Sequence, residues 1–255
     1  MSNIPVGVWI SLETLIVCLG VWRVIQFIKA YKNTEQSLPT VEKIEAMVNS
    51  QIKNKVLAAF LTRDFLTIYY LFSPSNKREP EQGTAFTLHK KIGYGGIMFG
   101  FLFVLVLEAG GVSYFLHSWS TVIAWIHLAL SLYLIIFLIS DYKAIKRNPV
   151  LLSPEKLHIR LGLRLKAQIY LHNIDSIKAG KINFEKDKKK KDVWNLTLFG
   201  FEDPDFEITL KEPLLLRDGV GRDCLIIKIY LTLDEKEEFL AQVKLLKEKV
   251  EVVGI

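Results

Sequence analysis

The chain has 255 residues, of which 50% are hydrophobic, and a formal net charge of +6. Its two cysteines, Cys18 and Cys224, are too few for a disulfide framework, and no Cys/His spacing of the zinc-finger kind occurs. Residues 1–147 have 14 Lys/Arg and 9 Asp/Glu, whereas residues 148–255 have 19 and 18. The basic excess therefore accompanies the apolar half of the chain, where it orients membrane segments, and argues against nucleic-acid binding.

The first apolar block comprises residues 4–28 and contains Glu13. Residues 1–7 have no basic side chain, so the block lacks the charged start of a secretory signal peptide. The sequence predicts an uncleaved membrane anchor over about residues 5–28.

A helix is predicted to begin after Pro39 and to continue through the apolar residues 56–72. The apolar part is short for a membrane span, and Arg63 and Asp64 lie at its centre, where a charge in a bilayer is costly. We therefore expect a helix over about residues 40–72 that lies in the membrane interface.

Residues 92–140 are the most apolar part of the chain, and Glu108 is their only formally charged side chain. A polar break at residues 113–120 divides them into two blocks, each suited to a hydrocarbon layer about 30 Å thick. The sequence predicts two spanning helices, over about residues 92–114 and 120–140, joined by a short turn.

Basic residues between the blocks indicate how often the chain crosses the membrane. If residues 56–72 do not cross, residues 29–55, residues 73–91 and the segment after Asp141 share one side with five, four and three Lys/Arg, and the other side has none. If they cross, the counts become 7 and 5. The positive-inside rule favours the first arrangement. It predicts three crossings, with the N-terminus outside and the C-terminal part cytoplasmic; residues 73–91 are expected to be loop.

After Pro149 the apolar residues alternate with polar ones. This alternation predicts strands at residues 156–161, 164–171, 174–179, 193–199, 206–211 and 224–231. Asp234 is expected to cap a closing amphipathic helix over residues 235–249. The predicted fold class is an α+β membrane protein, with a membrane domain in residues 1–148. Residues 149–255 are expected to form a cytosolic pleckstrin-homology-like (PH-like) antiparallel barrel closed by that helix.

Two parts of the chain resemble known families. Residues 151–250 resemble the bacterial PH-like domain, through Leu157-His-Ile-Arg-Leu-Gly, Ile174-Asp-Ser-Ile and Leu233-Asp-Glu with Phe239. The membrane half looks like multi-pass membrane proteins of Gram-positive, Bacillus-type bacteria, through Asp64 with Tyr69-Tyr70, Phe86-Thr-Leu-His, Glu108 with His117, and Ala124-Trp125. The resemblance implies a PH-like fold that serves in assembly and brings no established activity.

Glu13, Glu108 and His127 form the first candidate site, with His117 as a possible fourth member. Glu108 precedes the predicted turn by about seven residues and His127 follows it by about nine, so both would lie roughly 10–13 Å deep at 1.5 Å per residue. Three roles fit these side chains: hydrogen bonds that fix helix packing, a proton or ligand site, or a divalent metal site. The packing role is favoured, and no catalytic residue or cofactor is predicted.

Basic side chains of the second half form the other candidate site. Alternation places Lys156 and Arg160 on one face of the first predicted hairpin, and Arg164 and Lys166 continue that face. Lys188, Lys189, Lys190 and Lys191 belong to a lysine run expected at a hairpin tip. Both groups are suited to attraction by an anionic leaflet.

Two functions follow from these features. The first is a plasma-membrane scaffold or regulatory protein whose PH-like domain binds a protein partner, a second copy or the membrane surface. The alternative is a membrane-embedded protein, whether a binding protein or an enzyme, that handles a ligand, lipid or metal through Glu13, Glu108 and His127. Glu108→Gln separates them, because a scaffold should tolerate it and a ligand site should not.

Overall fold

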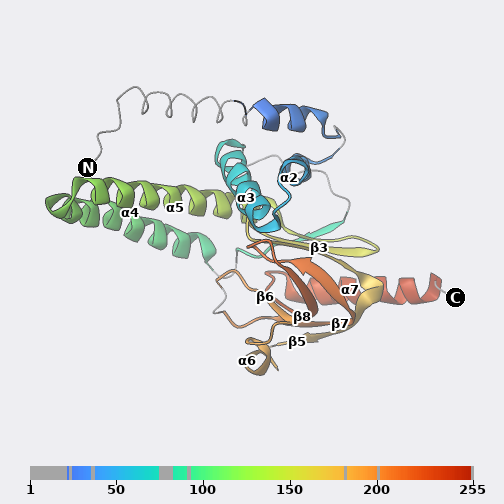
Figure 1. Cartoon of the computed structure of the whole chain (residues 1–255). Helices are drawn as coiled ribbons and strands as arrows, with labels where there is room; N and C mark the ends of the chain where they lie inside the picture. The colour runs from blue at the N-terminus through green and yellow to red at the C-terminus, as the bar shows by residue number, and fades with distance from the viewer. Residues whose placement is uncertain are drawn as a thin grey trace. The chain divides into compact units, whose positions relative to one another are not determined.

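A computed structural model of the chain is shown in Figure 1, and it describes residues 22, 25–35, 38–74, 83–90, 93–180, 183–199 and 202–253. Contacts divide the chain into two units, Met1–Phe65 and Leu66–Ile255, which are described separately. Most of the predicted first anchor, including Glu13, lies outside the described residues.

In the first unit, helix α2 (Thr40–Gln51) begins directly after Pro39, as the sequence predicts. The single helix expected over residues 40–72 is divided, because α3 (Lys55–Phe72) begins separately after a three-residue break; its last turns, from Leu66 on, belong to the second unit. The Asn54 side chain accepts hydrogen bonds from the backbone N–H groups of Val56 (3.0 Å) and Leu57 (3.1 Å). Such a cap satisfies amide groups that have no partner inside the helix, and it starts a new helix at this point.

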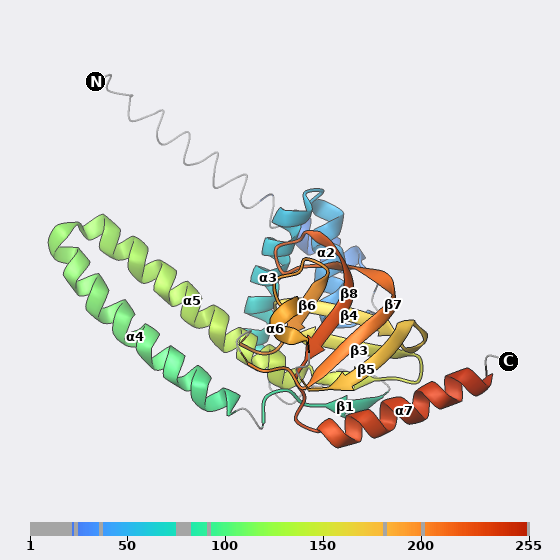
Figure 2. The ribbon, with the colours of Figure 1, turned by 90° about the horizontal axis from the view of Figure 1, so that it is seen from below.

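The second unit contains a pair of long antiparallel helices, α4 (Tyr94–Trp119) and α5 (Thr121–Arg147), which run side by side in both ribbon views (Figures 1 and 2). Both are long and apolar enough to cross a membrane. Only 11% of the most apolar window of α4 and 6% of that of α5 is buried, so neither is the core helix of a folded domain. The break expected over residues 113–120 is in fact limited to Ser120, because α4 continues to Trp119.

The strands form two four-stranded sheets. The first has the order β1-β2-β3-β4 and is antiparallel; its strands are β1 (Thr84–Phe86), β2 (Val150–Leu152), β3 (Lys156–Leu161) and β4 (Leu165–Tyr170). The second has the order β5-β7-β8-β6; its strands are β5 (Ile174–Ala179), β6 (Val193–Leu196), β7 (Phe206–Arg217) and β8 (Asp223–Leu231). The described strands do not close into a barrel, and β6 pairs with β8 in parallel, so the expected all-antiparallel arrangement is wrong at this edge.

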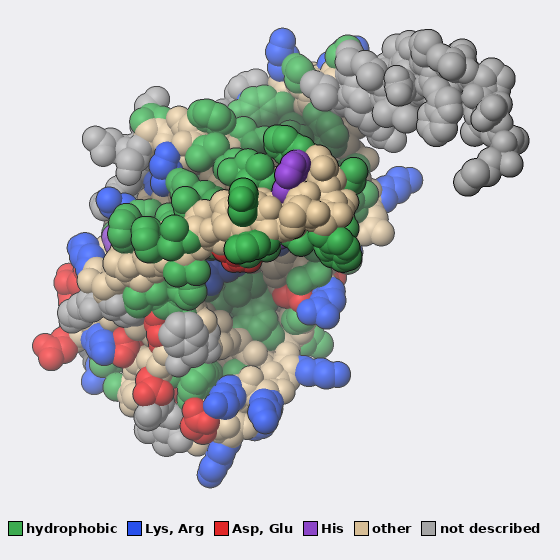
Figure 3. Space-filling model, turned by 90° about the vertical axis from the view of Figure 1, so that its left-hand side faces the viewer, with side chains coloured by type: hydrophobic (Ala, Val, Ile, Leu, Met, Phe, Trp, Pro, Cys, Tyr) green, Lys and Arg blue, Asp and Glu red, His purple; other side chains and the backbone are tan. Residues whose placement is uncertain are grey.

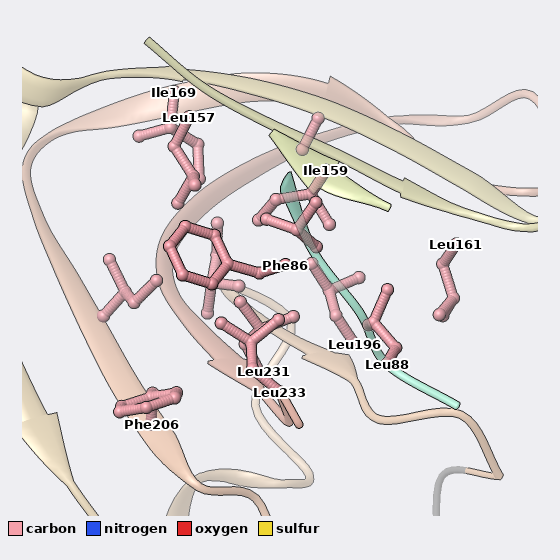
Figure 4. Packing of buried hydrophobic residues seen from close by; sticks show 14 of the residues in the cluster. Phe86, Leu88, Leu157, Ile159, Leu161, Ile169, Leu196, Phe206, Leu231 and Leu233 are labelled. Carbon is pink, nitrogen blue, oxygen red and sulfur yellow. The ribbon is translucent and has the colours of Figure 1, made fainter. Parts of the chain in front are cut away.

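Strand β1 was expected to be loop, yet Phe86 pairs with Val150 across a sheet edge. Its formation follows from burial: Phe86 is fully buried and lies in the middle of the hydrophobic cluster, between side chains from the two sheets (Figure 4). In the sequence, the α4–α5 hairpin is therefore inserted between β1 and β2, which are neighbouring strands of one sheet. The sequence pattern did not predict the three-residue strand β1, because Pro74 and Pro80 precede it and are typical of loops.

Helix α7 (Lys236–Val253) closes the core, as the sequence predicts. Phe239 is buried against Phe86 and Phe206, with ring centroids 5.2 Å from each. At the start of α7, Asp234 accepts hydrogen bonds from the Thr87 hydroxyl (2.7 Å) and the Lys90 N–H (2.9 Å). These bonds hold the segment before the α4–α5 hairpin against the C-terminal helix.

Candidate functional site

The α4–α5 hairpin brings two predicted site residues together. His127 on α5 lies with its Nε2 atom 4.0 Å from Oε1 of Glu108 on α4. Its other ring nitrogen, Nδ1, lies 2.9 Å from the hydroxyl of Ser113, which sequence reasoning did not include. A serine on the facing helix is the signal that could have identified it, because hydroxyl groups often join neighbouring apolar helices.

The remaining predicted members do not complete a metal site in the described residues. His117 is exposed near the end of α4, and Glu13 lies outside the described part of the chain. Among the residues that the structure describes, no group of three His, Cys, Asp or Glu side chains could hold a metal ion. The Glu108 and His127 side chains are 49% and 24% exposed, so they form an open pair rather than an enclosed pocket.

The chemistry of this pair is limited by its position within the helices. Ser113 lies inside α4, where the backbone N–H groups are used in helical hydrogen bonds. A serine nucleophile needs free N–H donors that can stabilise an oxyanion, and a helix interior does not supply them. The arrangement suits an interhelical hydrogen bond or the exchange of one proton.

The base of the hairpin forms a second polar site, around the buried carboxylate of Asp141. This carboxylate accepts a hydrogen bond from the Leu163 N–H (2.8 Å) and lies 3.4 Å from the Arg164 guanidinium. Gly162, between β3 and β4, has a φ of +56° and no room for a Cβ, since such an atom would overlap the Asp141 carboxylate. Arg164 also donates to the Leu198 carbonyl (2.7 Å), so a single guanidinium in the β3–β4 turn joins α5 to the segment that follows β6.

Apolar contacts continue this junction into the core. Tyr94, at the start of α4, stacks on Tyr142 of α5 with ring centroids 5.7 Å apart. Phe199, after β6, lies 5.1 Å from the Tyr94 ring. Tyr94 and Ile145 belong to the same hydrophobic cluster as the sheet residues. The two long helices are therefore attached through a packed base rather than through flexible linkers.

The end of α3 also contacts the base of α5. Lys143 donates to the Leu71 carbonyl (2.7 Å), and the Ser140 hydroxyl donates to the Thr67 carbonyl (2.9 Å). Asn148 donates to the Tyr70 hydroxyl (2.9 Å). Because the last carbonyls of a helix have no partners within it, a lysine at this point stabilises the helix end.

The predicted basic face of β3 and β4 is half-buried. Arg160 lies directly opposite Lys166 across the two strands, and each has further polar or electrostatic interactions. Lys156 lies 4.6 Å above the Tyr170 ring. Arg164 reaches the hairpin base, where it pairs with Asp141. The structure therefore brings two of the four predicted basic residues together and uses the other two in local contacts.

The lysine run follows a short helix, α6 (Phe184–Asp187), instead of forming a hairpin tip. Its flanking strands, β5 and β6, lie at opposite edges of the second sheet. All four lysines are exposed; Lys188 pairs with Glu185 (2.6 Å) and Lys190 with Asp187 (2.8 Å).

Sequence reasoning did not identify a buried polar cluster that is formed by residues of β7, β8 and α6. Lys228 lies 2.6 Å from Asp187 and 3.0 Å from Glu207, and the Tyr230 hydroxyl donates to both carboxylates (3.0 and 3.2 Å). Hydrogen bonds from Lys190 and Lys228 hold the pKa of Asp187 well below its usual range. Burial opposes ionisation of Glu207, but the bonds from Lys228 and Asn183 outweigh it and lower the pKa of that carboxyl.

A small acidic cleft of about 170 Å³ lies beside the start of α7. Its lining residues are Glu202, Asp203, Asp205, Thr232, Leu233, Asp234 and Lys236. Lys236 forms an ion pair with Asp205, and burial raises the pKa of Glu202. The acidic residues Glu202, Asp203 and Asp205 are the sequence signal that could have identified this cleft.

Neither a family model, nor a curated protein, nor a solved structure matches the chain. The structure defines a mixed α+β protein. Two helices able to cross a membrane are inserted in its sequence between the edge strand of a sheet and the neighbouring strand. These helices are consistent with a membrane location.

Proposed function

We propose that the chain is a membrane-anchored scaffold that holds a PH-like docking domain at the cytoplasmic face of the plasma membrane. The observation that carries this proposal is the insertion of the exposed, apolar α4–α5 hairpin between β1 and β2. Hydrophobic side chains cover the centre of the view from the side to which the hairpin extends, and charged side chains gather toward its edges (Figure 3). A surface this apolar favours lipid over water.

The packed hairpin base supports the scaffold role. Asp141, Arg164 and Tyr94 fix the sheets to the helices, so a partner bound by the sheets is held at a set orientation to the bilayer. The two four-stranded sheets and the closing helix α7 fit a PH-like domain, in which strand edges and loops bind partners. The three-crossing topology, with the N-terminus outside, follows from the basic residues on one side of the spans.

Cysteine labelling of intact bacterial cells tests the anchoring and its orientation. In a variant with Cys18 and Cys224 replaced by serine, we expect Ser120→Cys, between the two helices, to react with a membrane-impermeant maleimide. Ser153→Cys, beyond β2, should react only after the cells are opened. Equal reaction of both positions in intact cells would overturn the proposal, as would complete release of the chain from membranes at alkaline pH.

The second candidate function rests on the contact between Glu108, His127 and Ser113. This group could exchange a proton or bind the polar end of a small ligand within the bilayer. The test is mass spectrometry of the purified protein beside a Glu108→Gln/His127→Ala variant. One co-purified species that the variant loses would favour ligand handling. The scaffold function predicts the same composition for both.

A further inference from the structure

The far end of the β7–β8 ribbon has an apolar outer face. Leu215 and Leu225 lie directly opposite each other across the two strands and are 62% and 60% exposed. Their neighbours Leu216 and Ile226 are buried on the inner face, as the alternation of a strand requires. Val220 in the turn and Ile227 on β8 are also exposed. A pair of exposed leucines is unfavourable in water, so this face needs an apolar neighbour.

The position of this ribbon indicates what that neighbour is. A Cβ built on Gly219, in the β7–β8 turn, would lie 2.8 Å from the Arg164 carbonyl oxygen. Arg164 in turn pairs with Asp141 at the base of α5. The turn is therefore in contact with the β3–β4 turn, at the end of the sheets from which the two long helices extend. The tip of the ribbon is therefore joined, through Arg164, to the base of the helices that are proposed to enter the bilayer.

Charged residues beside the leucines also suit a lipid headgroup layer. Arg217 pairs with Asp223 (3.2 Å) and Arg222 with Asp218 (2.8 Å) at the turn. Arginine side chains have apolar stems and polar ends, which suits them to the boundary between acyl chains and headgroups. A protein partner is less suited, because four apolar side chains cover far less than the roughly 800 Å² per partner that stable protein interfaces bury.

We propose that the tip of the β7–β8 ribbon, residues 215–227, inserts its apolar face into the headgroup region of the same bilayer that holds α4 and α5. This inference rests on the proposed membrane anchoring and adds a second point of membrane contact. Because the packed base already fixes the sheets to the helices, the second contact would limit how far the hairpin and the sheets can tilt together relative to the bilayer.

Spin labels on the full-length protein in phosphatidylglycerol/phosphatidylcholine vesicles test this contact. Single cysteines replace Val220, Leu225, Val106 on α4 or Leu245 on α7, in the background without Cys18 and Cys224. Molecular oxygen is concentrated in lipid and a nickel chelate in water, so the ratio of their collision rates with the label reports depth. We expect Val220→Cys and Leu225→Cys to show a severalfold higher ratio than the aqueous control Leu245→Cys, approaching that of Val106→Cys.

The outcomes separate this inference from the anchoring. A lipid-like ratio at Val106→Cys with water-like ratios at Val220→Cys and Leu225→Cys would overturn the ribbon contact and leave the anchoring intact. So would labels at those positions that are immobilised without access to oxygen, which would indicate a second copy on this face. A water-like ratio at Val106→Cys would overturn both. Leu215→Ser, which weakens the contact, should shift the label at Val220→Cys toward water, whereas Leu245→Ser should not.

Discussion

At the scale of single residues, Gly162 fixes how the helices are attached to the sheets. Its positive φ and the lack of space beside Asp141 both require glycine. The neighbouring Leu163 N–H and Arg164 satisfy the buried carboxylate, which would otherwise be costly to bury. This one turn therefore combines a backbone requirement with an electrostatic one.

Gly162→Ala should loosen the hairpin base. The added methyl group meets Asp141 and forces a strained backbone, which should cost about 2 kcal/mol or more of local stability. Faster hydrogen exchange at residues 157–169 of the full chain in nanodiscs would reveal it. Gly96→Ala on α4 is the matched control, because a Cβ there has nothing within 4 Å. Equal exchange in both variants would show that the base does not depend on this contact.

Lys228→Met should destabilise the second sheet, because it leaves the buried Glu207 without its lysine and Asp187 with Lys190 as its remaining lysine partner. Removing one partner from a buried ion pair costs about 3 kcal/mol or more. The expected result is faster exchange of β7 and β8 amides at pH 7. Lys244→Met, at an exposed position of α7, should leave these rates unchanged. If Lys228→Met behaves like that control, the cluster does not stabilise the sheet.

At the scale of elements, the sequence predicted the longer strands and helices of the second unit and missed the two three-residue strands, β1 and β2, and the short helix α6. The alternation at residues 156–161 and the apolar blocks of α4 and α5 are strong local patterns. Strand β1 has only three residues, and its stability comes from Phe86 meeting residues far along the chain. The contact between Glu108 and His127 followed from helix rise, whereas the Lys228 cluster depends on which strands become neighbours.

Phe86→Ala should detach β1 from the sheet. Loss of a buried phenylalanine costs about 3–5 kcal/mol through lost burial and the cavity left behind. We expect protease cleavage of the full-length protein between residues 83 and 90 to become severalfold faster. Phe86→Leu keeps most of the volume and should restore much of the protection; no difference between the two variants would contradict the role of this side chain.

Asn54→Ala tests the division between α2 and α3. The variant loses the cap on Val56 and Leu57, which should cost about 1 kcal/mol of helix stability. Hydrogen exchange at residues 55–58 should increase, while Asn54→Asp, which keeps a capping oxygen, should match the parent protein. An unchanged rate in Asn54→Ala would mean that packing alone begins α3.

At the scale of the whole molecule, the Lys228 cluster makes stability depend on pH. The pKa values of Asp187 and Glu207 are lowered by folding, so their contribution is present above their unfolded pKa values of about 4 and is lost as the pH falls below them. The pKa of Lys228 is raised, so its contribution is complete below about pH 10 and is lost above it.

The melting temperature of the protein in nanodiscs should therefore be flat between about pH 5 and 10 with respect to this cluster and should fall on both sides. Differential scanning calorimetry from pH 3 to 7 measures the acid side. The Lys228→Met variant should lose less stability on acidification than the parent protein, because protonation relieves its repelling carboxylates. A parallel fall in the two proteins would show that other groups control the acid transition.

The insertion of α4 and α5 between paired strands has a consequence for synthesis of the chain. A ribosome makes β1 before either helix and β2 after both, so under the proposed membrane anchoring β1 stays unpaired until both helices have entered the bilayer. The strands can meet only if both ends of the hairpin return to the same side. Under that proposal, completion of the first sheet depends on membrane insertion, because a chain with one helix outside the bilayer would keep an open sheet edge.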